Sequence, residues 1–180
     1  MMIQSLNGPW RVNSADEKIK LSVNVPGTVY SSMLENKMIE DPFYRLNQYD
    51  ALKISDNDFI FAYDFIPDEA MLKNDRIFLR FDGIDTIAEV YLNDTAIGSS
   101  DNMHRTYKFD VTDCIRRGTN SLRVYIHSPI KYIKDKNDER DLWGVASTMK
   151  GYPHIRKAHY MYGWDWGPIL PDVGIWRDVS

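Results

Sequence analysis

The sequence predicts an all-β protein, built as an antiparallel β-sandwich with a few short helices. One observation is the alternation of apolar and polar residues in several short segments. In 121–127, for example, Leu122, Val124 and Ile126 share one face. A second observation is that turn-forming residues separate these segments. A third is the scarcity of helix start signals, each of which opens only a short segment.

The predicted strands are short and follow one another along the whole chain. In chain order they are residues 10–12, 19–25, 58–66, 76–81, 87–92, 96–98, 106–110, 121–127 and 174–179. Asn93-Asp94 provides a tight turn between two of them, which predicts a hairpin. In the first strand of that hairpin, Ala88, Val90 and Leu92 should face inward.

The predicted helices are marked by their first residues. Thr28 can cap a helix that runs over residues 29–36. Ser128-Pro129 is typical of an N-cap followed by proline at the first helical position, and it predicts a helix over 130–137. The charged run 131–141 is most simply a solvated face or loop.

The composition is that of a soluble globular protein, and the length favours one domain. The chain has 180 residues, of which 43% are hydrophobic and 27% charged. Its net charge is −4 and no basic stripe stands out, so nucleic acid is not an expected partner. No apolar stretch approaches the roughly 20 residues of a membrane span, so a membrane is not expected either.

The cysteine content and the first residues predict a cytoplasmic protein. Cys114 is the single cysteine, and it should be a buried, inert thiol because it lies among structural residues. A lone thiol fits a reducing compartment. Residues 1–10 lack the basic region and the long apolar run of a signal peptide.

Neither a metal nor a cofactor is predicted. The histidines show no spacing typical of metal ligands, and no glycine-rich phosphate loop is present. Pairs of carboxylates, such as Asp82 with Asp85 and Asp138 with Glu139, are better explained by turns and by the charged run than by catalysis.

The segment 141–174 carries the motif with most chemistry. It has few strand signals but many Gly, Pro, Trp and Tyr residues, and such long irregular segments are commonly functional. Within it, Gly163 to Pro168 reads Gly-Trp-Asp-Trp-Gly-Pro. Flat apolar rings beside an ionised acceptor suit a sugar, whose C–H faces pack on rings and whose hydroxyls donate hydrogen bonds. The same residues could also form a packed loop.

The local conformation of the motif decides what it presents. If the segment is extended, Trp164 and Trp166 share one face and Asp165 points to the other. A bend at Gly163 or Gly167 would change this arrangement, and the sequence leaves both possibilities open.

The chain resembles the N-terminal domain of glycoside hydrolase family 2 enzymes, and most closely the β-mannosidases among them. The residues that carry the resemblance lie in Leu6–Trp10, in Val25–Thr28 with Asp41–Tyr44, in Phe81–Asn93 and in Arg156–Pro168. The last is the segment specific to β-mannosidases. Together they extend over nearly the whole chain, and they imply a jelly-roll sandwich of the galactose-binding-domain type.

Some positions depart from the β-mannosidase pattern. Where those enzymes carry Gln, Phe and Trp, this chain has His159, Tyr162 and Phe59. These changes leave the resemblance intact but weaken any site role for His159.

The resemblance also implies that the catalytic residues of such enzymes lie in a different domain from this one. Two glutamates on a later (β/α)₈ barrel break the glycosidic bond, and a barrel needs about 250 residues. The chain holds no Asn-Glu dipeptide of the kind that carries the acid/base residue, so no catalytic residue is expected in it and it should be the N-terminal part of a larger glycosidase.

In that larger enzyme the Trp-Asp-Trp loop would line the pocket for a terminal β-mannoside. Asp165 would accept hydrogen bonds from the sugar, beside Trp164 and Trp166, and Arg156 could fix the loop carboxylate through an ion pair. The missing C-terminal domains would complete the site.

Other readings of the same sequence remain. The chain could be a stand-alone carbohydrate-binding module, with a sugar site on the sandwich itself. It could be a structural scaffold, with the Trp-Asp-Trp loop packed against a neighbouring domain. It could also belong to a β-galactosidase or β-glucuronidase of the same family.

Overall fold

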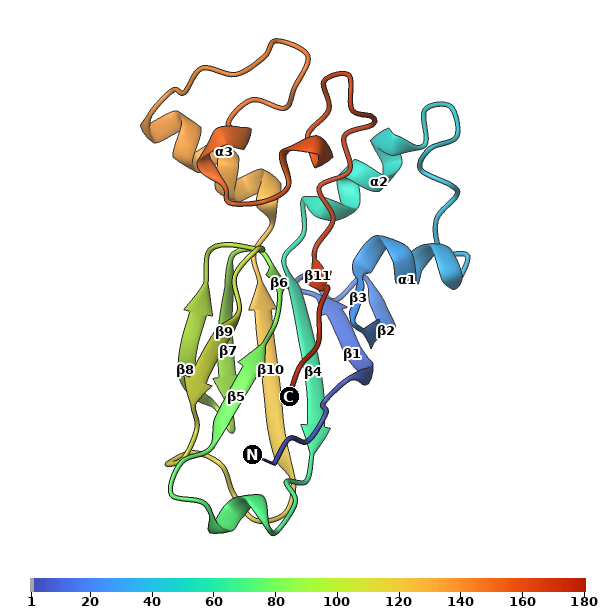
Figure 1. Ribbon diagram of the computed structural model, residues 1–180. Helices are drawn as coiled ribbons and strands as arrows, with labels where there is room; N and C mark the ends of the chain where they lie inside the picture. The colour runs from blue at the N-terminus through green and yellow to red at the C-terminus, as the bar shows by residue number, and fades with distance from the viewer. Residues whose placement is uncertain (1) are drawn as a thin grey trace.

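A computed structural model describes residues 2–180 and shows a sandwich of antiparallel strands (Figure 1). The larger layer is a six-stranded sheet with the order β2-β1-β4-β10-β7-β8. Its strands are β1 (Gly8–Ser14), β2 (Lys20–Val25), β4 (Phe59–Phe65), β7 (Ala88–Leu92), β8 (Thr95–Ser100) and β10 (Asn120–Ile126). The all-β sandwich that the sequence predicts is therefore confirmed.

The second layer consists of shorter strands. A three-stranded sheet has the order β3-β11-β6, and β5 pairs with β9. These strands are β3 (Gly27–Thr28), β5 (Phe78–Phe81), β6 (Ile84–Asp85), β9 (Tyr107–Asp110) and β11 (Gly174–Ile175). The predicted strand 174–179 is shorter in the structure, because residues 176–178 leave the ladder before Val179 pairs again with Phe81.

The core fills the space between the two layers and follows the alternation of the sequence. Leu122, Val124 and Ile126 on β10 are fully buried, and the inward side of β7 is buried as predicted. Trp10 on β1 is also fully buried, and its ring stacks on Tyr63 at 5.2 Å. Burial of these apolar side chains supplies the main driving force for folding.

The predicted hairpin is present between β7 and β8. Asn93 and Asp94 have φ angles of 50° and 67°, the left-handed values that a tight two-residue turn needs. The Asn93 amide also donates to the Cys114 carbonyl at 2.9 Å, which ties the turn to the following loop.

The two helices predicted from Thr28 and Ser128 are confirmed. In α1 (Val29–Glu35), the Thr28 side chain accepts from the Ser31 backbone N–H. In α3 (Pro129–Glu139), the Ser128 hydroxyl accepts from the Lys131 backbone N–H at 3.2 Å. The charged run 131–141 therefore lies largely on a helix.

The sequence analysis missed α2 (Gln48–Ser55). Its first turn lacks a side-chain cap, since Asn47 makes no capping hydrogen bond, and only Ala51 and Ser55 are buried. Neither a start signal nor an apolar stripe therefore marks this helix. The 3₁₀ turns η1 (Met71–Lys73), η2 (Tyr152–His154) and η3 (His159–Met161) complete the elements.

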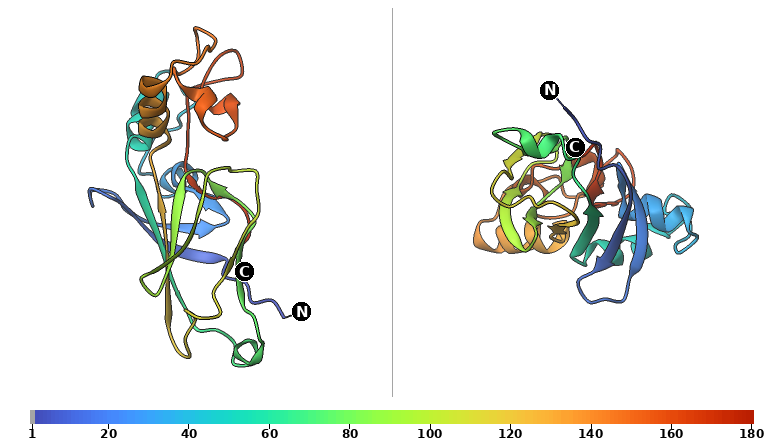
Figure 2. Two further views of the ribbon diagram at one scale, coloured as in Figure 1. Left: turned by 90° about the vertical axis from the view of Figure 1, so that its left-hand side faces the viewer. Right: turned by 90° about the horizontal axis from the view of Figure 1, so that it is seen from below.

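The segment 141–170 lies with α2 and α3 at one end of the sandwich (Figures 1 and 2). It has a small core of its own, formed by Ile133 of α3 with Ile155 and Tyr162, against which Tyr152 and Met149 pack. This cluster fixes the segment to α3 even though it contains little regular secondary structure.

Tyr162 carries a fully buried hydroxyl that has no hydrogen-bond partner within residues 2–180. Because a buried unpaired polar group is unfavourable, Tyr162→Phe should raise the free energy of unfolding by about 1 kcal/mol, measured by urea denaturation. Tyr30→Phe is the matched control: its hydroxyl donates to the Ala51 carbonyl at 2.7 Å, so that variant should lose stability. A loss of stability in Tyr162→Phe would contradict the prediction.

Candidate functional site

The Trp-Asp-Trp motif forms the tip of a closed loop. An antiparallel bridge joins Tyr162 to Ile169, and the Leu170 N–H donates to the Met161 carbonyl at 2.9 Å. Between these contacts the chain bends at Gly163 and Trp164, whose φ angles are 96° and 66°. The bend that the sequence left open is thus present, and the motif is not an extended strand.

Glycine is required at the bend. A Cβ atom on Gly163 would lie 3.0 Å from Ile169 Cγ1 and 3.1 Å from the Ser147 carbonyl oxygen, in addition to the left-handed φ. Two hydrogen bonds to other segments of the chain also fix the position of the tip. The Trp164 N–H donates to Ser147 O at 3.3 Å, and the Ile169 N–H donates to Gln48 Oε1 of α2 at 3.0 Å.

The tip presents two aromatic rings and one carboxylate to solvent. Trp164 and Trp166 are 45% and 52% exposed, and their rings meet edge to face at 4.7 Å. Asp165 is also exposed, and within residues 2–180 it makes no hydrogen bond or ion pair. The arrangement leaves an acceptor and apolar ring surface available to a ligand. That Asp165, Trp164 and Trp166 contact a sugar remains a prediction.

A groove of about 350 Å³ runs beside the tip, between the loop and α1. Trp166 and Tyr160 contribute to one side of it, and Phe43 and Tyr30 to another. Phe43 is 74% exposed, which is unusual for so large an apolar ring. The sequence analysis named Asp41–Tyr44 only for its resemblance to the family; its place beside the tip emerges from the fold.

Arg156 does not take the place expected for it. It is exposed, and in the described part of the chain it forms no ion pair with Asp165. Its backbone is used instead, since the Arg156 carbonyl accepts from the Met103 N–H at 3.0 Å. The buried ion pair of this region is formed by the next residue, Lys157.

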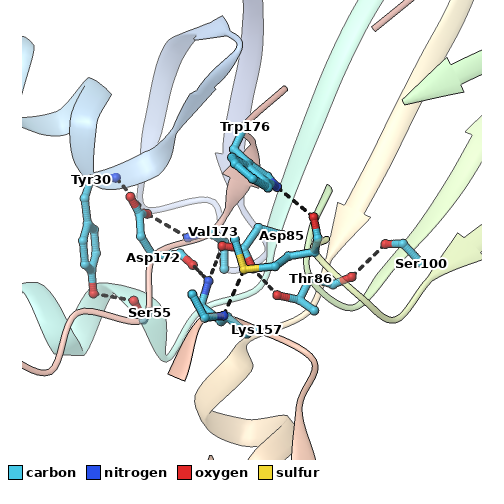
Figure 3. Close-up of polar contacts among 11 residues, drawn as sticks. Tyr30, Ser55, Asp85, Thr86, Ser100, Lys157, Asp172, Val173 and Trp176 are labelled. Atoms are coloured by element: carbon cyan, nitrogen blue, oxygen red, sulfur yellow. Dashed lines mark hydrogen bonds and ion pairs between the residues drawn. The ribbon is translucent and has the colours of Figure 1, made fainter. Parts of the chain in front are cut away.

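Lys157 lies in a buried polar network that joins the loop to the sandwich (Figure 3). Its side chain is fully buried and forms an ion pair with the Asp85 carboxylate of β6, which is itself only 2% exposed. The ammonium also donates to the Asp172 carbonyl at 2.5 Å. The Thr86 hydroxyl donates to the other oxygen of Asp85, and its carbonyl accepts from Ser100 at 2.8 Å.

Asp172 extends this network towards α1. Its carboxylate accepts from the Tyr30 N–H at 3.0 Å and from the Val173 N–H at 2.8 Å. Removal from water raises the pKa of Asp172 from its ordinary value of 3.8 to about 6, against the lowering effect of these hydrogen bonds and of Lys157. Burial and the negative charge of Asp85 also raise the pKa of Tyr162 well above its ordinary value.

The structure corrects the interpretation of Asp85 as a turn residue. Asp85 lies on a strand and is buried because Lys157 neutralises it. In the sequence, Asp85 stands between Ile84 and Thr86, just after Asp82-Gly83, and nothing in these neighbours marks it as buried. Its partner lies 72 residues later, and such a separation cannot be read from a single sequence.

Two tyrosines of the segment and the lone cysteine differ in their exposure. Tyr162 is fully buried inside the segment, whereas Tyr160 is 58% exposed. Cys114 is partly buried, and removal from water raises the pKa of its thiol. Within residues 2–180 there is no group of acidic, histidine or cysteine side chains that could hold a metal ion. The helices of this same range include none with both the length and the apolar character of a membrane span.

A family comparison decides the relationship. The family described as glycosyl hydrolase 2 galactose-binding domain-like matches residues 10–177. The chain belongs to this family. The match includes most of β1, all the other strands of the sandwich and the Trp-Asp-Trp loop, and it confirms the fold that the resemblance implied.

The relatives point to β-mannosidases within the family. The β-mannosidases of Bos taurus and Mus musculus share 35% and 34% sequence identity with this chain, in alignments that cover 97% of it. The crystal structure of the β-D-mannosidase from Dictyoglomus thermophilum superposes on 99% of the chain, with a TM-score of 0.94 and 36% identity. The resemblance to the N-terminal domain of such enzymes is therefore confirmed.

The chain corresponds to only a part of the length of these relatives. It spans 21% of the length of the two mammalian relatives and 22% of the Dictyoglomus thermophilum enzyme. A more distant structure, the exo-chitosanase of Amycolatopsis orientalis, superposes on 71% of the chain with a TM-score of 0.60 and 19% identity. That likeness shows the sandwich fold alone.

Proposed function

We propose that this chain is the N-terminal sandwich domain of a β-mannosidase, a hydrolase of terminal β-D-mannosides. In this proposal residues 1–180 form one domain, and the bond is broken by catalytic residues in polypeptide beyond it. The observation that carries the proposal is the agreement over 99% of the chain with a β-D-mannosidase, at a TM-score of 0.94 and 36% identity.

The role of the chain in that enzyme is to supply part of the sugar subsite. Asp165 accepts hydrogen bonds from the hydroxyls of the terminal mannoside, while Trp164 and Trp166 offer apolar ring surface. All three side chains are exposed at the end of a loop that hydrogen bonds to Ser147 and Gln48 hold in place, and this arrangement supports the role. Arg156 is exposed near the start of the loop, and its contribution to the site comes from contacts outside residues 2–180.

The test is the substitution Asp165→Ala in the full-length enzyme. We expect kcat/KM for an aryl β-mannoside to fall at least about tenfold, which corresponds to about 1.4 kcal/mol of lost transition-state stabilisation. Asp165→Asn, which keeps one acceptor oxygen, should lose less. The measurement is steady-state kinetics, with melting temperatures to show that both variants fold.

Asp135→Ala is the matched control, because Asp135 is an exposed carboxylate on α3 that forms no ion pair in the described part of the chain. It should leave kcat/KM unchanged. If Asp165→Ala behaves in the same way, the sugar contact is refuted. If the full-length enzyme hydrolyses an aryl β-galactoside or β-glucuronide better than the mannoside, the assignment of the sugar is refuted.

We also propose a cytoplasmic location. The lone Cys114, partly buried and with a raised pKa, is suited to a reducing compartment and has no partner cysteine in this chain. Cell fractionation with an antibody against the protein would test this, and recovery from the secreted fraction would contradict it.

A further inference from the structure

The Trp-Asp-Trp tip belongs to a segment whose two ends lie next to each other. The segment runs from Ala158 to Pro171, and the residues that flank it, Lys157 and Asp172, are joined by the hydrogen bond from Lys157 Nζ to the Asp172 carbonyl (Figure 3). Further along, the next contact between the two arms is Leu170 N–H to Met161 O. Lys157 therefore closes the base of the segment.

The base is fixed to the sandwich from several sides. Asp85 pairs with Lys157 through its side chain, and its backbone is in register with Gly174 of β11. Two hydrogen bonds join the base to α1 as well. The Asp172 carboxylate accepts from the Tyr30 N–H, and the Val173 carbonyl accepts from the Val29 N–H at 2.9 Å. One side chain thus links the start of the segment, its end and strand β6.

The chemistry of this link is more specific than packing requires. A buried ion pair is weak evidence for stability, because well-packed apolar side chains of similar volume often do as well or better. An ammonium group, however, can donate to as many as three acceptors at once, which an apolar side chain cannot do. Lys157 meets a carboxylate and a carbonyl from two different parts of the chain, so it defines a geometry that an apolar side chain would not define.

We propose that Lys157, with Asp85 as its anchor, is a positioning residue that sets the place of the Trp-Asp-Trp tip. It acts through the segment 158–171 and does not touch the sugar. The part of this proposal that concerns turnover rests on the proposed function of Asp165. The part that concerns the order of the segment does not.

The test compares the full-length enzyme with the double variant Lys157→Met, Asp85→Asn. This variant removes both charges together, so neither is left buried without a partner. Amide hydrogen exchange in residues 158–171 should become at least about tenfold faster, while exchange in β10 stays as in the wild type. In parallel, kcat/KM for an aryl β-mannoside should fall by about tenfold.

A double-mutant cycle then separates positioning from general damage. Asp165→Ala should have little further effect in the Lys157→Met, Asp85→Asn background, less than about threefold, because the tip is already misplaced there. Additive losses would overturn the positioning role. Lys136→Met, which breaks an exposed pair with Glu139 on α3, is the matched control and should change neither readout.

The outcomes distinguish the two proposals. If Asp165→Ala has no effect in the wild-type background, the sugar contact fails, and the exchange rates of 158–171 still decide the role of Lys157. Unchanged exchange there overturns the positioning proposal. Should the double variant not fold, the double variant Lys157→Gln, Asp85→Asn keeps polar side chains at both positions and leaves no charge buried without a partner. It should still speed exchange in 158–171 about threefold or more, and an unchanged rate again overturns the proposal.

Discussion

Replacing Lys157 alone by methionine should lower the free energy of unfolding by about 3–5 kcal/mol. Methionine fills a similar volume but leaves the Asp85 carboxylate buried without its counter-ion, and it removes the donor to the Asp172 carbonyl. Such an unpaired charge is among the most destabilising changes a point substitution can make. Urea denaturation followed by circular dichroism measures the loss.

Two further variants check the cause of this loss. Adding Asp85→Asn to Lys157→Met should restore most of the stability, since the uncompensated charge disappears. Lys53→Met, which breaks the exposed pair with Asp50, should change stability by no more than about 0.5 kcal/mol. A loss below about 1 kcal/mol for Lys157→Met would show that water reaches Asp85.

The second prediction with a large expected effect is that the contribution of Asp172 to the free energy of unfolding depends on pH. The folded state raises the pKa of Asp172 to about 6 from 3.8, so it holds the proton more tightly than the unfolded chain does. The contribution of Asp172 to stability is therefore fully present below about pH 4 and is lost as the pH rises through 6. The difference corresponds to about 3 kcal/mol by pH 8.

Asp172→Asn isolates this contribution. The amide oxygen can still accept from Tyr30 N–H and Val173 N–H, but the group no longer ionises. The free energy of unfolding of the variant, measured relative to the wild type by urea denaturation, should rise by about 2–3 kcal/mol between pH 4 and pH 8. All other titrating groups are shared, so parallel pH profiles for the two proteins would contradict the prediction.

Much of the sandwich could be predicted from the sequence because its signals are local. Alternation marked β7 and β10, Asn93-Asp94 marked the hairpin, and Thr28 and Ser128 marked two helices. Each signal lies within a few residues of the structure it produces. The helix α2 was missed for the converse reason, since it has neither a cap nor an apolar stripe.

The candidate site was predictable only in part. The Trp-Asp-Trp motif could be recognised by its composition, but its bend at Gly163 and the braces from Ser147 and Gln48 depend on the tertiary fold. The same holds for Lys157: a lysine next to Arg156 reads as a surface residue. Only the fold shows that the exposed cation is Arg156 and the buried one Lys157.

The closed base of the segment 158–171 has a consequence for the evolution of specificity. A loop whose ends are already held together can change in length at a small entropic cost, which grows only with the logarithm of the number of residues. Residues at its tip contribute little to the central core, which lies between the two layers. The tip is thus an exchangeable module: under the proposed role of Asp165, ligand preference can diverge there while the supporting scaffold stays the same.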